Sequence, residues 1–150
     1  MVEPSRSYLI LMVDDDPEDS LLVREALGET GYRHQLRFLY NGEELLDYLH
    51  RRGKYVDQQS SPRPDLILLD LKMPKMEGKE VIRQLKSDPL LKRIPIVVLT
   101  TSTAQDDICS AYQTGVNSYV TKPVTFRELV DIMKGLGKYW FEVVKLPPAE

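Results

Sequence analysis

Three continuous apolar runs constrain the fold of this 150-residue chain more than any other feature of its sequence. They are YLILMV at 8–13, LILLDL at 66–71 and IPIVVLT at 94–100, and none shows regular alternation of polar and apolar residues. This pattern is typical of strands that are buried on both faces of a parallel sheet. Two weaker extended segments, HQLRFLY at 34–40 and VNSYVT at 116–121, bring the predicted strands to five.

Segments of helical periodicity separate the strands, and their ends have recognisable capping residues. The N-cap candidates are Asp16, Asn41 and Thr125, and the candidates for a left-handed C-cap are Gly31 and Gly115. Strands and helices that alternate with short connections require right-handed crossovers, which give a mostly parallel sheet covered by helices on both faces. The sequence therefore predicts a doubly wound, five-stranded α/β fold.

Length and composition limit the class of protein. A chain of 150 residues with 42% hydrophobic content is large enough for one core, so we expect a single domain over 1–150. Lysine and arginine are scattered and the net charge is -3, which predicts no direct binding of nucleic acid. The single Cys109 cannot form an internal disulfide, and no leader or membrane-length apolar run is present. We therefore expect a cytoplasmic protein that does not contact a membrane.

Polar residues follow the buried runs directly. They are Asp14, Asp15 and Asp16 after the first strand, Asp70 after the third, Thr100 at the end of the fourth and Lys122 after the fifth. In open α/β sheets, ligands bind outside the carboxyl ends of the strands. Neighbouring strands lie about 5 Å apart, so we expect Asp70 to face the acidic group across a small crevice.

The chemistry of these residues points to phosphoryl transfer. Carboxylates this close repel one another unless a cation is present, and Mg²⁺ is a hard ion that one or two carboxylates typically hold together with a phosphate. Lys122 adds a positive charge and Thr100 a hydroxyl donor, which suits a site that stabilises transferring phosphoryl oxygens. Asp70 is then the predicted nucleophile, which would form an aspartyl phosphate.

Four motifs resemble the receiver domain of bacterial two-component response regulators over about residues 7–135. In chain order they are MVDDD, LILLDLKMPKMEG, IPIVVLTTS and GVNSYVTKPV. The resemblance implies a flavodoxin-like sheet with strand order 2-1-3-4-5. It also implies a role for each matching position: Asp15 as direct Mg²⁺ ligand, Asp14 acting through water, Asp70 as phosphoacceptor, the backbone carbonyl of Lys72 as a metal ligand, Thr100 and Tyr119 as switch residues, and Lys122 as the phosphoryl-binding lysine before a cis bond to Pro123.

Receivers take their phosphoryl group from a sensor histidine kinase, and the resemblance implies that this chain is not an enzyme beyond Mg²⁺-dependent self-phosphorylation and self-dephosphorylation. No output segment follows the fifth predicted helix, so we expect a stand-alone receiver. Asp16 is first of all an N-cap, with metal binding as a secondary role. Many receivers have a smaller residue at the position of Thr101. We expect Thr101 and Lys72 to influence the lifetime of the phosphorylated state.

Two further segments resemble the small regulators that pair with cyanobacterial phytochrome kinases. They are an extended loop at about 53–64 and an aromatic tail at about 138–150, which contains KYWFEVVKLPP. Members of that group form homodimers through the fourth helix, fifth strand and fifth helix, and the resemblance implies the same here. Three adjacent helical residues cannot all face one core, which makes Tyr139, Trp140 and Phe141 candidate dimer contacts.

Two other functions stay open. A phosphatase of the haloacid dehalogenase type also uses a strand-end aspartate and Mg²⁺, but it requires a second aspartate two residues on, where this chain has Lys72. A receiver-like scaffold that serves only dimerisation is the other possibility. Such a scaffold has no need to keep mutually repelling acids together, which favours the phosphorylation switch.

Overall fold

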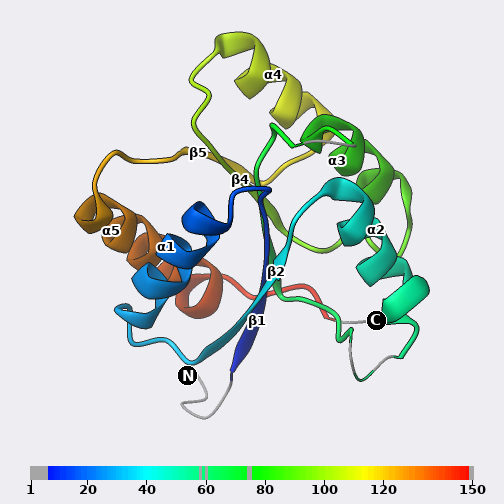
Figure 1. The fold of residues 1–150 in the computed structure, drawn as a ribbon, viewed down its shortest axis with the longest axis horizontal. Coiled ribbons are helices and arrows are strands. Elements are labelled where there is room, and N and C mark those ends of the chain that lie inside the picture. Colours follow the sequence, from blue (N-terminus) through cyan, green and yellow to red (C-terminus); the bar gives the residue numbers. More distant parts are fainter. Residues whose placement is uncertain (1–6, 58, 60, 74–75, 149–150) are drawn as a thin grey trace.

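Five parallel strands form a single sheet at the centre of the molecule (Figure 1). The computed structural model describes residues 7–57, 59, 61–73 and 76–148. Pro74 and the ends of the predicted domain and tail, 1–6 and 149–150, lie outside the described residues. The sheet order is β2-β1-β3-β4-β5, and every neighbouring pair is parallel. The strands are β1 Tyr8–Val13, β2 His34–Leu39, β3 Leu66–Leu69, β4 Ile96–Thr100 and β5 Ser118–Thr121. The predicted doubly wound fold and its 2-1-3-4-5 order are confirmed.

The three central strands are buried on both faces, as their apolar runs predict. Every residue of β1, β3 and β4 is buried. The edge strands differ, because β2 buries only Leu39 and β5 buries no residue completely. Continuous apolar sequence therefore corresponds to the centre of the sheet and mixed sequence to its edges.

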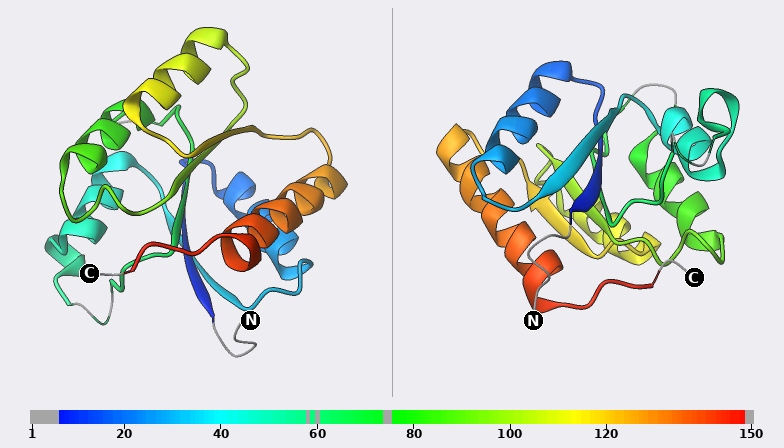
Figure 2. Two further views of the ribbon diagram at one scale, coloured as in Figure 1. Left: turned by 180° about the vertical axis from the view of Figure 1, so that it is seen from behind. Right: turned by 90° about the horizontal axis from the view of Figure 1, so that it is seen from below.

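Helices cover both faces of the sheet, with α1 and α5 on one face and α2, α3 and α4 on the other (Figure 2). The bounds are α1 Pro17–Gly28, α2 Gly42–His50, α3 Gly78–Ser87, α4 Gln105–Thr114 and α5 Phe126–Gly137, with a short 3₁₀ turn Gly53–Tyr55 and a π-helix Lys138–Val143. The α-helices turn buried residues toward the strands, several each from α1, α2, α3 and α5 and Ala111 from α4, which produces two apolar cores separated by the sheet. In the part of the chain that the structure describes, no helix has the length and apolar character needed to cross a membrane.

The helix caps agree with the sequence at four of five positions. The side chains of Asp16, Asn41 and Thr125 each accept a hydrogen bond from a backbone N–H of the following turn. Gly115 is the left-handed C-cap of α4, with φ +116°. The prediction for Gly31 is wrong, because α1 ends three residues earlier and its C-cap, the residue at 29, has right-handed backbone angles. Gly31 instead takes φ +83° in the connection to β2.

The aromatic tail folds onto its own chain, which corrects two of the predicted dimer contacts. Trp140 and Phe141 are only 8% and 5% exposed, whereas Tyr139 is 50% exposed. The Phe141 ring stacks on the ring of Tyr8 with centroids 4.0 Å apart, and the Tyr8 hydroxyl donates to the Phe141 carbonyl at 3.1 Å. The tail continues α5 as a π-helix, whose wider turn leaves a smaller angle between successive side chains and lets two neighbours face one core. Of the three predicted dimer contacts, Tyr139 is the one whose side chain is exposed enough to meet a partner.

The extended loop after α2 is held against that helix. The Tyr48 hydroxyl donates to the Pro62 carbonyl at 2.7 Å, and the Tyr55 hydroxyl donates to Glu44 Oε2 at 2.7 Å. Ser61 Oγ closes the loop on itself by donating to the Tyr55 carbonyl at 2.9 Å. Through these hydrogen bonds, most of the predicted surface loop packs along α2.

Candidate functional site

The predicted site residues meet at the carboxyl ends of four neighbouring strands. Hydrogen bonds between backbones continue past the ends of the strands: the amide of Asp70 donates to the Val13 carbonyl at 2.9 Å, and that of Lys122 donates to the Thr100 carbonyl at 2.7 Å. The residue that follows each strand is thereby fixed beside its neighbour from the adjacent strand. The sequence could predict this juxtaposition because parallel strands all end at the same edge.

Three carboxylates form one acidic cluster at this edge. Asp14, Asp15 and Asp70 each offer an oxygen, and these oxygens lie within 4.8 Å of one another. Asp14 and Asp70 are buried, whereas Asp15 is exposed. Burial raises the pKa of Asp14 above its ordinary value, against the hydrogen bond from Lys122, because a charged carboxylate is costly away from water. A set of oxygen ligands with this much negative charge fits a hard divalent cation.

Lys122 binds three carboxylates at once. Its Nζ lies 2.6 Å from Asp14 Oδ2, 2.8 Å from Asp19 Oδ2 and 3.4 Å from Asp70 Oδ2. Burial alone would lower the pKa of Lys122, but the hydrogen bonds to Asp14 and Asp19 and the attraction of the carboxylates outweigh it, so the pKa is raised. The ammonium is therefore a permanent positive charge inside the acidic site.

Asp19 is the site residue that the sequence analysis missed. It lies in the first turn of α1, three residues after the N-cap Asp16, and that turn begins at the end of β1. Residues three apart lie on the same side of a helix, so a capping aspartate beside the acidic cluster was a signal that Asp19 faces the same edge. Which lysine it would meet depends on where β5 lies, which the sequence near Asp19 does not encode.

Thr100 carries a hydroxyl that is free to bind a ligand. The residue is 0% exposed, and its Oγ1 has no hydrogen-bond partner within the described parts of the chain. A buried polar atom without a partner costs about 1–3 kcal/mol, and native structures rarely leave one without a reason. The hydroxyl ends β4 beside Asp70, where an added phosphoryl oxygen would give it an acceptor.

Tyr119 connects the site to a loop and to two helices. The side chain is partly buried against the core, and its hydroxyl donates to the Ser102 carbonyl at 2.9 Å. Ser102 Oγ in turn donates to Asp107 Oδ2 on α4 at 2.6 Å, and Asp107 pairs with Lys79 of α3 at 3.0 Å. The hydrogen bond from Ser102, followed by the contact with Lys79, lowers the pKa of Asp107, so its carboxylate stays charged. The predicted switch tyrosine thus begins a chain of polar contacts that reaches α3; its rotation stays a prediction.

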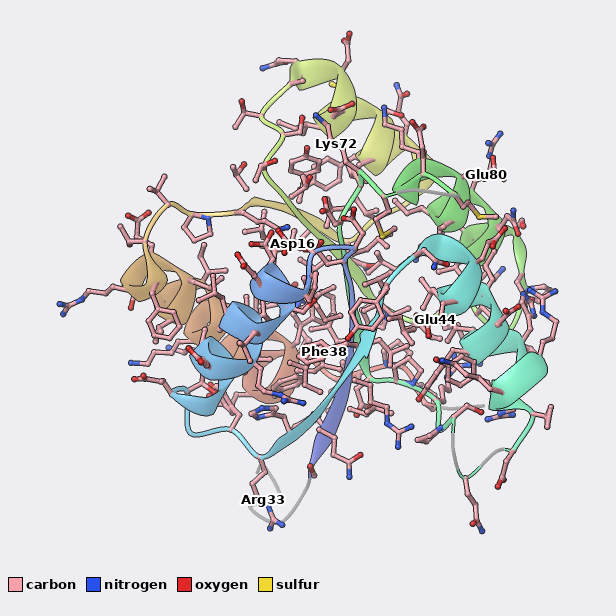
Figure 3. All side chains as sticks on the ribbon, viewed as in Figure 1. Asp16, Arg33, Phe38, Glu44, Lys72 and Glu80 are labelled. Atoms are coloured by element: carbon pink, nitrogen blue, oxygen red, sulfur yellow. The ribbon has the colours of Figure 1, made fainter. Side chains whose placement is uncertain are left out.

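Asp16 and Lys72, both labelled in Figure 3, lie in the loops that follow β1 and β3. Asp16 Oδ1 accepts from the Glu18 amide at 2.9 Å, so its side chain serves as the N-cap of α1. The Lys72 amide lies 3.4 Å from Asp70 Oδ1, and the metal-binding role of its carbonyl stays a prediction.

The predicted cis bond before Pro123 is not found, because no peptide bond in the described ranges is cis. For a bond before proline the trans form is favoured by about 0.5–1 kcal/mol. The amide of Lys122 also holds the backbone in the extended β5 ladder through its bond to Thr100.

Gly78 lets α3 pack directly on the backbone that carries the phosphoacceptor candidate. A Cβ at this position would lie 2.8 Å from the Asp70 carbonyl oxygen and 2.8 Å from Leu71 Cα, closer than real Cβ atoms approach. Only glycine allows this contact without a shift of the backbone. The start of α3 therefore supports the position of Asp70.

Comparisons with known proteins agree with this geometry. The family model of the response regulator receiver domain matches residues 10–134. Response regulator Rcp1 of Synechocystis sp. is 43% identical over 147 residues, which cover 98% of each chain. The crystal structure of Mn²⁺-bound Rcp1 superposes with a TM-score of 0.84 at 42% identity, covering 94% of this chain and 99% of the other. The phosphorylated cyanobacterial phytochrome response regulator RcpA superposes with a TM-score of 0.88 at 41% identity, covering 95% of this chain and all of the other.

Proposed function

The chain belongs to the response regulator receiver family, and from this membership we propose that it is a phosphorylation switch whose acceptor is Asp70. The observation that carries the proposal is the position of the Asp70 carboxylate within the acidic cluster, 3.4 Å from the Lys122 ammonium. The neighbouring strand β4 ends in Thr100, whose hydroxyl has no hydrogen-bond partner among the described residues. RcpA, which is 41% identical, has been solved in a phosphorylated form, and this supports the same chemistry here.

The donor that we propose is the phosphohistidine of a sensor histidine kinase of the phytochrome type. The support comes from relatives, because RcpA is described as a cyanobacterial phytochrome response regulator. We place this exchange in the cytoplasm. The exposed, unpaired Cys109 fits that compartment, where thiols stay reduced.

Asp14, Asp15 and Asp70 would hold a divalent cation, for which we propose Mg²⁺, with the Lys72 carbonyl as a further ligand. The Mn²⁺-bound form of Rcp1 supports a divalent metal at such a site. When it is bound, the cation neutralises negative charge on the carboxylates and on the phosphoryl oxygens. Oxygen ligands alone, two of them on buried carboxylates, suit this ion.

The chain's own residues would act as follows. A carboxylate oxygen of Asp70 forms a bond to phosphorus as the bond from phosphorus to the donor histidine nitrogen breaks, and the histidine leaves with that electron pair. The Lys122 ammonium binds one phosphoryl oxygen and the Thr100 hydroxyl donates to another. Release is the attack of water on the same phosphorus, which regenerates the Asp70 carboxylate and inorganic phosphate.

The phosphoryl group would change the surface through Thr100 and Tyr119. A hydrogen bond from Thr100 to a phosphoryl oxygen would fix the position of Thr100. It would also fix the loop that follows Thr100, which the Tyr119 hydroxyl holds through its hydrogen bond to the Ser102 carbonyl. This biases an existing equilibrium between two arrangements of that loop and α4. We propose that the active arrangement favours a homodimer through α4, β5 and α5. Tyr112 on α4, which is 50% exposed, supports an interface there.

We also propose that the chemistry is confined to Asp70 of the chain itself. A phosphatase of the haloacid dehalogenase type needs an acid two residues after the nucleophile, and Lys72 cannot serve as one. Sustained turnover of p-nitrophenyl phosphate would contradict this assignment.

The test is intact-protein mass spectrometry after incubation with Mg²⁺ and acetyl phosphate or phosphoramidate. The expected result is a gain of one phosphoryl mass that requires Mg²⁺ and is lost in Asp70→Asn. Asp131→Asn is the matched control, because it removes the same charge from an exposed residue of α5 that lies outside the acidic cluster. No gain in the wild-type chain under any of these conditions would overturn the proposal and leave the dimerisation scaffold.

A further inference from the structure

Asp19 contributes a third carboxylate to the lysine of the site. We propose that Asp19 is a positioning residue that competes with the metal-binding carboxylates for the Lys122 ammonium and keeps the ammonium directed at the phosphoryl site. The inference rests on the proposed function for the phosphoryl step, but its effect on the metal site can be measured without phosphorylation.

The three partners of Lys122 differ in what else they can bind. Asp14 and Asp70 belong to the acidic cluster, and the oxygens that contact Lys122 come from the same two carboxylates that the cation needs. Asp19 lies outside that cluster and comes from α1 rather than from a strand end. Its carboxylate, 35% exposed, lies 2.8 Å from the ammonium. Asp19 is therefore a partner that Lys122 can keep while the cluster binds a cation.

Lys122 and a divalent cation compete for the same carboxylates. The ammonium has three N–H donors, and the structure gives it three carboxylates. The pull of Asp19 toward α1 weakens the hold of the lysine on Asp14 and Asp70. Without that pull, the lysine would bind the two cluster carboxylates alone and would resist their transfer to the cation.

The same contact matters after transfer. Phosphorylation converts the Asp70 carboxylate into an acyl phosphate, whose carbonyl and bridging oxygens carry no full negative charge, and Asp14 would help to hold the cation. Asp19 remains as the ionic partner that orders the long lysine side chain, which otherwise loses rotamer entropy when it binds the phosphoryl oxygen. A hollow of about 50 Å³ between α1 and α5 is lined in part by Asp19 and Lys122.

The first experiment is calorimetric titration of the full chain with MgCl₂. Asp19→Asn should weaken Mg²⁺ binding about fivefold, the size of coupling that contacting charged groups show. Glu18→Gln is the matched control: it removes the same charge from an exposed residue of the same helical turn, and Glu18 does not contact Lys122 in the described structure. We expect a change within about twofold for this control, because exposed charges are well screened. Asp19→Glu, which keeps the carboxylate, should recover most of the affinity.

A double-mutant cycle separates positioning from simple charge. In a Lys122→Met background the lysine no longer competes, so Asp19→Asn should have no more effect than Glu18→Gln. With phosphoramidate, Asp19→Asn should be phosphorylated about tenfold more slowly than the wild type, and Glu18→Gln at the wild-type rate. Circular dichroism melting checks that each variant is folded.

The outcomes are distinct. If Asp19→Asn matches Glu18→Gln in the titration, or has the same effect with and without Lys122, the inference is wrong and the proposed function is untouched. If the wild-type chain takes no phosphoryl group, the proposed function fails, and the titration cycle still decides whether Asp19 positions Lys122.

Discussion

The hydroxyl of Tyr119 donates a hydrogen bond to the carbonyl oxygen of Ser102 at 2.9 Å, which links β5 to the loop that follows β4. The side chain of Ser102 is bonded in turn to Asp107 of α4. The loop beside the acceptor site is therefore held through both the backbone carbonyl and the side chain of Ser102. A change of position at Thr100, two residues before Ser102, would be transmitted to α4 through these bonds.

Removal of the Tyr119 hydroxyl should loosen this loop. Tyr119→Phe keeps the ring and its packing but loses the bond to Ser102, so the free energy of unfolding should fall by about 1 kcal/mol. Urea denaturation measures the change. Tyr139→Phe is the control, because Tyr139 is half exposed and its hydroxyl loss should leave stability unchanged. Equal stability of the two variants would show that the bond to Ser102 contributes nothing.

The ionisation of Glu44 should make the stability of the loop after α2 depend on pH. Burial would raise the pKa of Glu44, but hydrogen bonds from Tyr55, the Tyr40 amide and Lys54 outweigh it, so the folded pKa lies below the ordinary value of 4.5. The unfolded chain then binds the proton more readily than the folded chain. The stabilisation is complete above the ordinary pKa and is lost as the pH falls through the folded pKa.

Glu44→Gln tests this dependence. The variant should be less stable than the wild type by about 1 kcal/mol at pH 7, and the difference should shrink as the pH is lowered below 4.5. Urea denaturation across this pH range gives the result. Glu43→Gln, at an exposed neighbouring position, should show neither effect. A difference that stays constant with pH would mean that the ionisation of Glu44 is not what stabilises the loop.

Gly78→Ala should disturb the acceptor itself. The new Cβ would meet the backbone of Asp70 and Leu71 at 2.8 Å, so the free energy of unfolding should fall by about 1–3 kcal/mol. Because the displaced backbone carries Asp70, phosphorylation by acetyl phosphate should also slow. Gly28→Ala is the control, since a Cβ there has nothing within 4 Å and should stabilise α1 by up to about 1 kcal/mol. A Gly78→Ala variant with wild-type stability and phosphorylation would contradict the close packing of α3.

Phe141 should behave as a core residue and not as a dimer contact. Phe141→Ala should lower the free energy of unfolding by about 3–5 kcal/mol, because it empties a site stacked against Tyr8. Tyr139→Ala should change it by no more than about 0.5 kcal/mol. Urea denaturation at low protein concentration gives both values. If Phe141→Ala instead left the unfolding curve intact and weakened self-association in sedimentation experiments, the tail would be an interface after all.

Part of the candidate site follows from local sequence. Each central strand is a continuous apolar run, and the last or next residue of every strand lies at the carboxyl edge because all strands of a parallel sheet point the same way. Asp14, Asp70, Thr100 and Lys122 could therefore be brought together from sequence alone. The motifs around them also indicate the receiver family, which the match over residues 10–134 bears out.

Other features depended on the packing of distant segments. The contact of Asp19 with Lys122 requires a particular rotation of α1 against β5, and the links from Ser102 to Asp107 and Lys79 require α3 and α4 to lie side by side. These orientations are set by side chains that interlock across the core, so no local pattern encodes them.

What the sequence by itself determined is the order of the elements, the buried strands and the acids that end them, because strand burial and helix caps are local properties of the chain. Only the tertiary structure decided that Trp140 and Phe141 belong to the core and that Lys122 has three carboxylate partners. The wider turn of the π-helix lets Trp140 and Phe141 face the same core. The three partners of Lys122 come together because α1 and the ends of β1, β3 and β5 meet at one edge of the sheet. Both arise from the competition of many distant contacts for the same space, which acts only once the chain is folded.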